Sequence, residues 1–211
     1  MSPRPYRLGQ RQAAIDETRA RIIAAARQLL VSADPGQFSI DAVARQADVS
    51  RATVYYQFHS KLGLLEALFD SAGASGGMAG LADAFRQDDP LDALDEFVAV
   101  FGRFWSAERL LHRRLRGLAI LDPDLGQALQ SRQEWRRQGA AALVSRFVTE
   151  SGTPTTKQAP DVIDLVFTVT SFEAFDVLAG ADRTPAAVIP QTQHLARAAL
   201  TLGPPTPHPG A

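Results

Sequence analysis

Apolar residues in the N-terminal third of the chain recur at helical spacing, in short runs separated by turn-forming residues. Within residues 39–47 the apolar positions fall at i, i+3, i+4 and i+7, which places them on one helical face. Ser50, a residue type that caps helix N-termini, precedes a second run with inward positions at Val54 and Phe58. Asp48 lies between the runs, where a turn needs a residue that tolerates left-handed backbone. The pattern predicts a helix-turn-helix.

Helical periodicity continues along the rest of the chain, and no segment alternates convincingly as a strand does. We expect a first helix capped at Thr18 and ended by Asp34-Pro35-Gly36, and a further helix that opens at Lys61. Glycines after residue 72 interrupt the pattern. Later helices are expected at about 79–86, 90–106, 108–121, 125–151, 160–179 and 185–202.

The predicted fold class is all-α, with an N-terminal three-helix helix-turn-helix domain joined to a larger C-terminal helical domain. The predicted parts are a flexible basic arm at 1–17, the helix-turn-helix domain at 18–72, the larger domain at 73–203 and a disordered, proline-rich tail at 204–211.

Charge is unevenly distributed, although the formal net charge of the 211 residues is only -1. Residues 1–62 hold nine Lys/Arg and five Asp/Glu, whereas the remainder holds thirteen and eighteen. A basic N-terminal third suits a nucleic-acid-binding module, and ordinary charge scatter is the alternative.

The absence of cysteine excludes disulfides and thiolate metal sites. We expect a cytoplasmic protein without a membrane span or signal peptide.

The candidate DNA-reading side chains are the outward positions of the second short helix and its flanks: Arg51, Ala52, Thr53, Tyr55, Tyr56 and Gln57. Arginine and glutamine can read guanine and adenine edges bidentately, and threonine can contact a thymine methyl. The chain has no asparagine, so adenine reading falls to Gln57 or to indirect readout. We expect Tyr56 to contact phosphate rather than to read a base. Tyr55 either faces outward or packs inside the domain.

Helix starts supply candidate phosphate contacts. Lys61 combines a positive charge with the free N–H groups of a helix N-terminus, which predicts a phosphate clamp. Thr18 and Ser39 either cap their helices only or also contact phosphate. Three arginines before the first helix either lie along DNA as an arm or belong to an inert tail: Arg4, Arg7 and Arg11.

From Thr18 to Phe69, the segments TRARIIAAARQLL, FSIDAVARQADVS and ATVYYQFHSKLGLLEALF resemble the tetracycline-repressor (TetR-type) family of bacterial transcriptional regulators. The resemblance supports the phosphate role of Lys61. Asp48 departs from it, because the family usually has glycine there, and should cost about 1 kcal/mol in turn strain. Gln57 departs from a frequent His or Tyr, which puts one inherited phosphate contact in doubt.

The resemblance implies that residues 73–203 form a ligand-binding and dimerisation domain. We therefore expect a ligand-responsive regulator, a repressor, that binds a near-palindromic double-stranded DNA operator as a homodimer. The alternatives within regulation are an activator and a regulator without a ligand, and the sequence does not distinguish them. The helices near 125–151 and 160–179 are the expected interface, paired across the dimer as a four-helix bundle.

Aromatic residues of the larger domain are concentrated near basic ones. Aromatic walls with a few polar groups describe a small-molecule pocket, and they equally describe a packed core or a dimer core. If a pocket exists, its effector is largely apolar or aromatic with one polar or anionic group. The candidate ligand-binding residues are Phe101, Phe104, Trp105, Arg109, His112, Trp135 and Phe172.

Catalytic and cofactor motifs are not supported by their sequence context. Gly73-Ala74-Ser75-Gly76-Gly77 matches a nucleophile elbow, but that motif needs a preceding strand, and a linker explains it better. The histidines are scattered without metal-ligand spacing, and no P-loop or dinucleotide fingerprint occurs. We therefore expect no enzyme, cofactor or metal. The alternative function is an all-α catalytic or small-molecule-binding protein that does not bind DNA.

Overall fold

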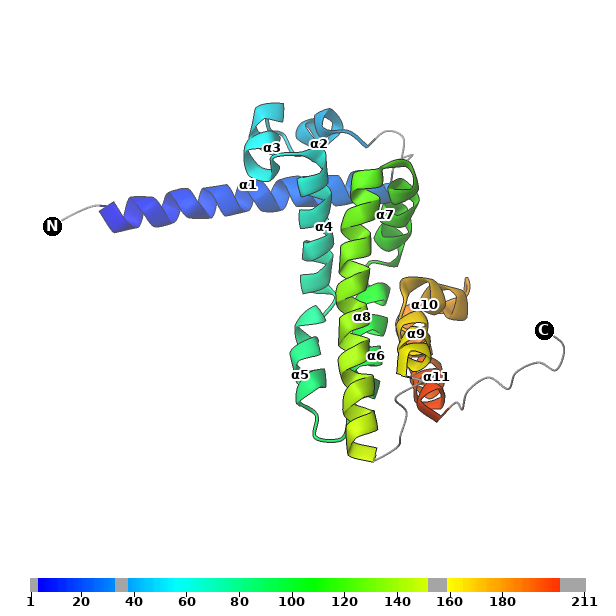
Figure 1. Cartoon of the computed structure of the whole chain (residues 1–211). Helices are drawn as coiled ribbons and strands as arrows, with labels where there is room; N and C mark the ends of the chain where they lie inside the picture. Colours follow the sequence, from blue (N-terminus) through cyan, green and yellow to red (C-terminus); the bar gives the residue numbers. More distant parts are fainter. Residues whose placement is uncertain (1–3, 33–37, 152–158, 202–211) are drawn as a thin grey trace. The chain divides into compact units, whose positions relative to one another are not determined.

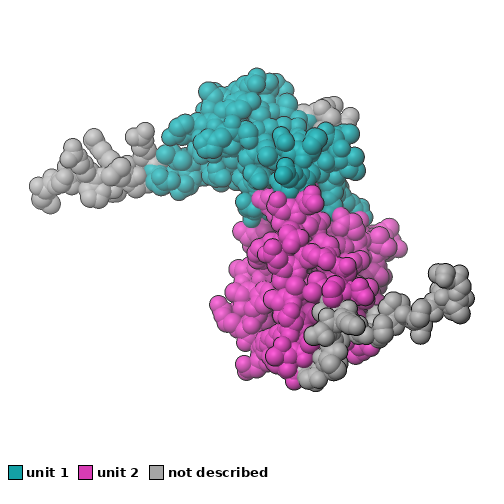
Figure 2. Space-filling model, in the orientation of Figure 1, with its two compact units in different colours: residues 1–72, 110–128 teal, residues 73–109, 129–211 magenta. Residues whose placement is uncertain are grey.

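The structure, a computed structural model, describes residues 4–32, 38–151 and 159–201, and every regular element in these ranges is helical. The predicted all-α class is confirmed. Figure 2 shows two compact units: unit 1 comprises residues 1–72 and 110–128, and unit 2 comprises residues 73–109 and 129–211. Residues 110–128, assigned by the sequence to the larger domain, therefore pack with the N-terminal helices. None of the described helices has both the length and the apolar character needed to span a bilayer.

Unit 1 contains the predicted helix-turn-helix. It is built from α1 (Arg4–Ser32), α2 (Ile40–Gln46), α3 (Arg51–Phe58), most of α4 (Lys61–Ser75), nearly all of α7 (Arg109–Leu121) and the start of α8 (Pro123–Ser151). Figure 1 shows α2 and α3 beside α1. Its core consists of large apolar side chains from each of these helices, among them Ile22, Leu30, Val43, Val54, Phe58, Leu64, Leu68, Leu115 and Leu125.

The first helix begins at Arg4, so the prediction of a cap at Thr18 is wrong. Thr18 lies within α1, and its hydroxyl donates to the Ala14 carbonyl oxygen at 2.8 Å. Pro5 does not interrupt the helix because its position in the first turn tolerates proline. Residues 4–17 of the expected flexible arm are thus helical, and residues 1–3 and the tail at 204–211 lie outside the described residues.

Unit 2 is organised around α6 (Pro90–Ala107), whose central residues are almost all buried. The end of α4, the 3-10 turn η2 (Met78–Gly80) and α5 (Leu81–Arg86) precede it. Most of α8, then α9 (Ala159–Val169), α10 (Phe172–Ala179), the 3-10 turn η3 (Pro185–Val188) and α11 (Ile189–Thr201) complete the unit. In Figure 1 the helices α9, α10 and α11 are grouped together.

The helix predicted over 160–179 is broken at Thr170 and Ser171 into α9 and α10. The Thr170 hydroxyl donates to the Val166 carbonyl oxygen at 2.8 Å, a bond that can bend a helix. The Ser171 hydroxyl accepts from the Ala174 amide at 3.1 Å and so caps α10. Arg136 of α8 donates to the Phe167 carbonyl and to the Thr170 hydroxyl. The break therefore depends partly on a side chain from another helix.

Candidate nucleic-acid interface

The helix-turn-helix is fixed locally by two caps and one left-handed turn residue. The Ser39 hydroxyl accepts from the Ala42 amide at 3.2 Å, and the Ser50 hydroxyl accepts from the Thr53 amide at 3.0 Å. Asp48 adopts a positive φ of 52° between the helices. The Ser39 and Ser50 caps and the left-handed turn are thus confirmed. Any contact of Ser39 with phosphate stays a prediction.

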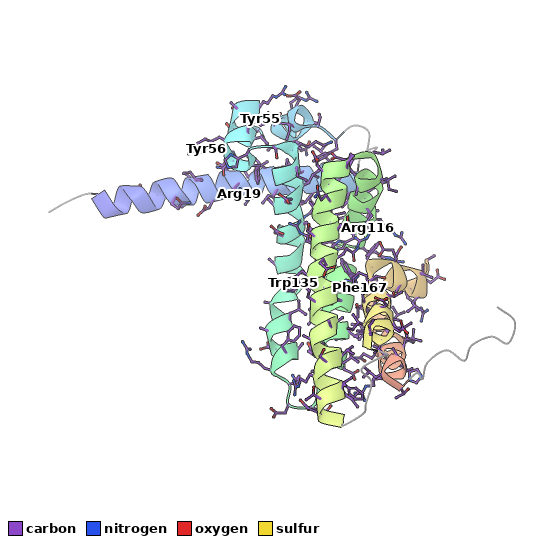
Figure 3. The ribbon with its side chains drawn as sticks, viewed as in Figure 1. Arg19, Tyr55, Tyr56, Arg116, Trp135 and Phe167 are labelled. Carbon is purple, nitrogen blue, oxygen red and sulfur yellow. The ribbon has the colours of Figure 1, made fainter. Side chains whose placement is uncertain are left out.

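The outward face of α3 is polar and accessible. Tyr56 is 73% exposed and Tyr55 is 39% exposed, so Tyr55 takes the outward of its two predicted placements. Figure 3 shows both rings on α3. Arg51 and Ala52 are exposed as well, whereas Thr53 and Gln57 are half-buried. All six side chains that the sequence named as DNA-reading candidates are thus at least partly exposed, whereas Val54 and Phe58 of the same helix are buried.

Arg51 is held loosely beside its neighbours. Its guanidinium lies 3.4 Å from the Asp41 carboxylate of α2, and it donates to the Tyr55 hydroxyl at 3.4 Å. The hydrogen bond with Tyr55, together with the charge of Asp41, raises the pKa of Arg51 above its ordinary value. Because these contacts are long and exposed, the guanidinium can exchange them for a nucleic acid.

Arg19 of α1 supports the C-terminal end of α3, a role that helical periodicity did not reveal. It donates to the Gln57 carbonyl oxygen at 2.8 Å, and its guanidinium carbon lies 4.4 Å from the centroid of the Phe58 ring. Figure 3 shows Arg19 on α1. A cation there satisfies a terminal carbonyl and opposes the negative end of the helix dipole. Arg19 thereby helps to fix the position of α3 in unit 1.

A tight turn between α3 and α4 determines the position of Lys61, the first residue of α4. His59 has a positive φ of 64°, and the Ser60 amide donates to the Phe58 carbonyl oxygen at 2.7 Å. The Ser60 hydroxyl accepts from the Gly63 amide at 2.9 Å. A Cβ on Gly63 would lie 2.2 Å from the Phe58 carbonyl oxygen, so this close approach requires glycine. Lys61 is half-exposed, and its ammonium lies 3.6 Å from Asp122.

The aromatic candidates of unit 2 form one packed cluster. The Trp105 ring centroid lies 5.9 Å from Phe101, 4.4 Å from Phe104 and 5.7 Å from Phe172. All four side chains are buried, and the Trp105 indole donates to the Thr170 carbonyl oxygen at 3.1 Å. Arg136, which the sequence did not single out, is 2% exposed, and its guanidinium carbon lies 5.8 Å from the Phe101 ring.

The other three candidate ligand-binding residues lie elsewhere. Arg109 pairs with Asp176 and donates to the Gly180 and Arg183 carbonyl oxygens. His112 belongs to unit 1, where its ring centroid lies 5.8 Å from that of Phe69. Trp135 is 54% exposed. Only the four aromatic residues of the cluster are therefore brought together by the described structure.

The model of the family described as bacterial regulatory proteins, tetR family, matches residues 22–68, which include the helix-turn-helix. This segment of the chain is thus similar to the TetR family, and the match extends over less than half of the 211 residues. The chain is 41% identical over 56 residues to the HTH-type transcriptional regulator SrpR of Pseudomonas putida. That alignment covers 26% of this chain and 26% of SrpR. The sequence similarity to this regulator thus spans about a quarter of each chain.

Solved structures of TetR-family proteins resemble the chain over most of its length. A putative regulator from Mesorhizobium loti has a TM-score of 0.65 at 17% identity and covers 89% of this chain and 96% of its own. The transcriptional regulator FadR of Bacillus subtilis, in complex with stearoyl-CoA, has a TM-score of 0.65 at 15% identity. The match covers 84% of this chain and 96% of the FadR chain. At such identities the similarity establishes the fold and not the ligand.

Proposed function

We propose that this chain is a DNA-binding transcriptional regulator, a ligand-responsive repressor that binds a near-palindromic operator as a homodimer. The observation that carries the proposal is the exposed polar face of α3, which bears Arg51, Tyr55 and Tyr56 beside Lys61 at the start of α4. A recognition helix of this kind reads base edges in the major groove, while cations at helix starts contact phosphate. The alternative, an all-α carrier or enzyme without DNA binding, is favoured by no catalytic or metal-binding group of side chains among the described residues.

Selection of bound duplexes from a randomised pool tests this proposal and yields the operator. Arg51→Ala and Gln57→Ala should each relax base preference, at a cost of about 1–3 kcal/mol of discrimination. Lys61→Ala should weaken binding to every duplex alike and reduce its salt dependence. Arg86→Ala in unit 2, where Arg86 is also exposed, is the control and should leave binding unchanged. A wild-type protein whose duplex binding is absent or independent of salt would contradict the proposal.

The proposed homodimer forms through the C-terminal helices. Helices α8, α9, α10 and α11 each leave a large apolar side chain exposed: Trp135, Leu165, Val177 and Leu195. Exposed apolar side chains are typical of an interface, and unit 1 exposes Ile120 and Leu121 as well. Two-fold pairing would also present two copies of α3 to successive half-sites of an operator.

Replacement of an exposed apolar residue by glutamate tests the dimer without disturbing the packed core of either unit. Val177 is 80% exposed and Ile120 is 84% exposed. Glutamate at either position should therefore not impair folding. Val177→Glu should weaken dimerisation in unit 2, whereas Ile120→Glu in unit 1 should not. Light scattering provides the mass of each variant. A monomeric mass for the wild-type protein at micromolar concentration would contradict the homodimer.

The proposed effector is largely apolar or aromatic and binds beside the cluster of Phe101, Phe104, Trp105 and Phe172. The rings supply apolar surface, and the buried Arg136 supplies a cation within reach of Phe101. Stearoyl-CoA, bound by the B. subtilis protein, has the same combination of a long apolar chain and anionic groups. The cluster is closely packed, so binding requires its side chains to rearrange.

Tryptophan fluorescence tests the effector site. In a Trp135→Phe background, Trp105 is the remaining tryptophan, because the chain has two. Acyl-CoA thioesters of increasing chain length should change its emission and weaken duplex binding together. An unchanged emission from Trp105 while duplex binding falls would place the effector away from the cluster.

A further inference from the structure

The Lys61 ammonium lies between two groups from distant parts of the sequence, both in unit 1. It is 3.6 Å from the Asp122 carboxylate and 5.9 Å from the centroid of the Phe38 ring. Phe38 directly precedes α2, and Asp122 is the single residue between α7 and α8. The side chains of Lys61 and Asp122 are 39% and 28% exposed, so solvent and solutes reach both.

The Asp122 carboxylate is held in place by the helices on either side of it. Its amide donates to the Leu118 carbonyl oxygen at 3.0 Å, and its Oδ1 accepts from the Leu125 amide at 3.3 Å. The carboxylate thus caps the start of α8 with Oδ1. It pairs with Lys61 through Oδ2. A capped carboxylate cannot readily turn away, so it stays close to Lys61.

An exposed pair of this kind contributes little to folding, but a fixed negative charge strongly affects a neighbouring anion site. A phosphate that approaches the Lys61 ammonium must displace the carboxylate or share the ammonium with it. We propose that Asp122 is a positioning residue that competes with DNA phosphate for Lys61 and thereby lowers the affinity for DNA without contacting a base. This inference rests on the proposed function and identifies a determinant of affinity outside the helix-turn-helix.

The test uses the full-length protein and a fluorescent 30-base-pair duplex of mixed sequence, with binding measured by anisotropy over a range of salt. Asp122→Asn removes the charge and retains a good helix cap, as does Asp122→Ser. Each should tighten binding about two- to fivefold, the range expected when an exposed ion pair no longer has to be broken. The slope of log affinity against log salt should also steepen, by up to about 0.9, because Lys61 then neutralises phosphate more fully.

A double-mutant cycle with Lys61→Ala separates competition from general charge repulsion. In the Lys61→Ala background, Asp122→Asn should produce no further gain in affinity. Asp124→Asn, which removes an exposed acid from the first turn of α8, is the matched control. Any effect of that control should be the same with and without Lys61.

Two results would overturn the inference while leaving the proposed function intact. An equal gain from Asp122→Asn with and without Lys61 would mean that the carboxylate acts by long-range repulsion. Weaker binding by a folded Asp122→Asn protein would mean that Asp122 holds Lys61 ready for phosphate instead of competing with it. Failure of the wild-type protein to bind any duplex in a salt-dependent way would overturn the proposed function, and this inference with it.

Discussion

The two candidate DNA-contacting cations of unit 1 are held differently from three arginines of unit 2. In unit 1, Arg51 is exposed and Lys61 is half-exposed, and the carboxylate partner of each lies 3.4 Å or 3.6 Å away, a long distance for an ion pair. In unit 2, Arg109 and Arg136 donate to backbone carbonyls of α9, α10 and the turn after α10, and Arg197 pairs with both oxygens of Asp95. Where helix ends leave carbonyls within reach, arginines stabilise the protein's own fold. Where such acceptors are absent, the charge is available to a partner.

Aromatic side chains differ between the units in the same way. Tyr56 of α3 is 73% exposed, whereas Trp105 of α6 is 4% exposed and packs against three other rings. The comparison predicts that substitutions in unit 2 mainly change stability, while substitutions on the outward face of unit 1 mainly change DNA binding.

The largest effect is expected at Trp105. Trp105→Ala should lower the free energy of unfolding by about 3–5 kcal/mol, because it leaves a cavity among packed rings. Tyr56→Ala should change it by no more than about 0.5 kcal/mol, since an exposed ring leaves no cavity. Urea unfolding followed by circular dichroism measures both values. Equal losses for the two variants would invalidate the contrast between the units.

Arg136 provides the next largest effect. Arg136→Met keeps most of the side-chain volume but removes the donors to the Phe167 carbonyl, the Thr170 hydroxyl and the Gln133 amide oxygen. Leaving such acceptors unsatisfied should cost about 1–3 kcal/mol of unfolding free energy. Arg45→Met on the exposed surface of α2 is the control and should be close to neutral. A neutral result for Arg136→Met would show that the guanidinium is dispensable to the α9–α10 break.

Two glycine substitutions of comparable cost should separate stability from DNA binding. Gly63→Ala places a Cβ 2.2 Å from a backbone oxygen of the α3–α4 turn, and Gly102→Ala places one 2.4 Å from the Ile189 side chain. Each should cost about 1–3 kcal/mol of stability through overpacking. Only Gly63→Ala should also weaken duplex binding at a temperature where both variants are folded, because it displaces Lys61. Loss of binding by folded Gly102→Ala would contradict this separation.

The smallest effect is expected at Asp48. Its φ of 52° lies in the left-handed region, where glycine has no steric penalty. Asp48→Gly should therefore raise the free energy of unfolding by about 0.5–1 kcal/mol. Asp48→Asn, which tolerates the same backbone, should be nearly neutral. Thermal unfolding distinguishes the two, and destabilisation by Asp48→Gly would mean that the aspartate side chain itself stabilises the turn.

The sequence predicted the features of unit 1 that arise from local chemistry. Ser39, Asp48 and Ser50 are recognisable because a cap or a left-handed turn needs particular residue types at particular places. The start of α1 was missed because a threonine can cap a helix or, as Thr18 does, bond back to a carbonyl inside one. Short-range patterns do not distinguish these two uses.

The features that sequence reasoning missed in unit 2 depend on long-range contacts. The break between α9 and α10 involves Arg136, which is more than thirty residues away in the chain. Arg109 was predicted to hold a ligand, but it holds α10 and the segment after it. Neither contact could be identified from periodicity, since Arg136 of α8 reaches α9, and Arg109 of α7 reaches α10, only once these helices are packed together.

The contact between Arg19 and the end of α3 has a consequence for the timescale on which the recognition helix opens. A helix of eight residues is too short to persist in water by itself. Because the Gln57 carbonyl and the Phe58 ring are held by Arg19 of α1, the hydrogen-bonded amides near the C-terminal end of α3 should not exchange with solvent deuterium by fraying of that end alone. Their exchange should follow the opening of the α1 packing as one cooperative unit. The proposed DNA-reading surface should then be as long-lived as the core beneath it, with its arrangement set before any DNA binds.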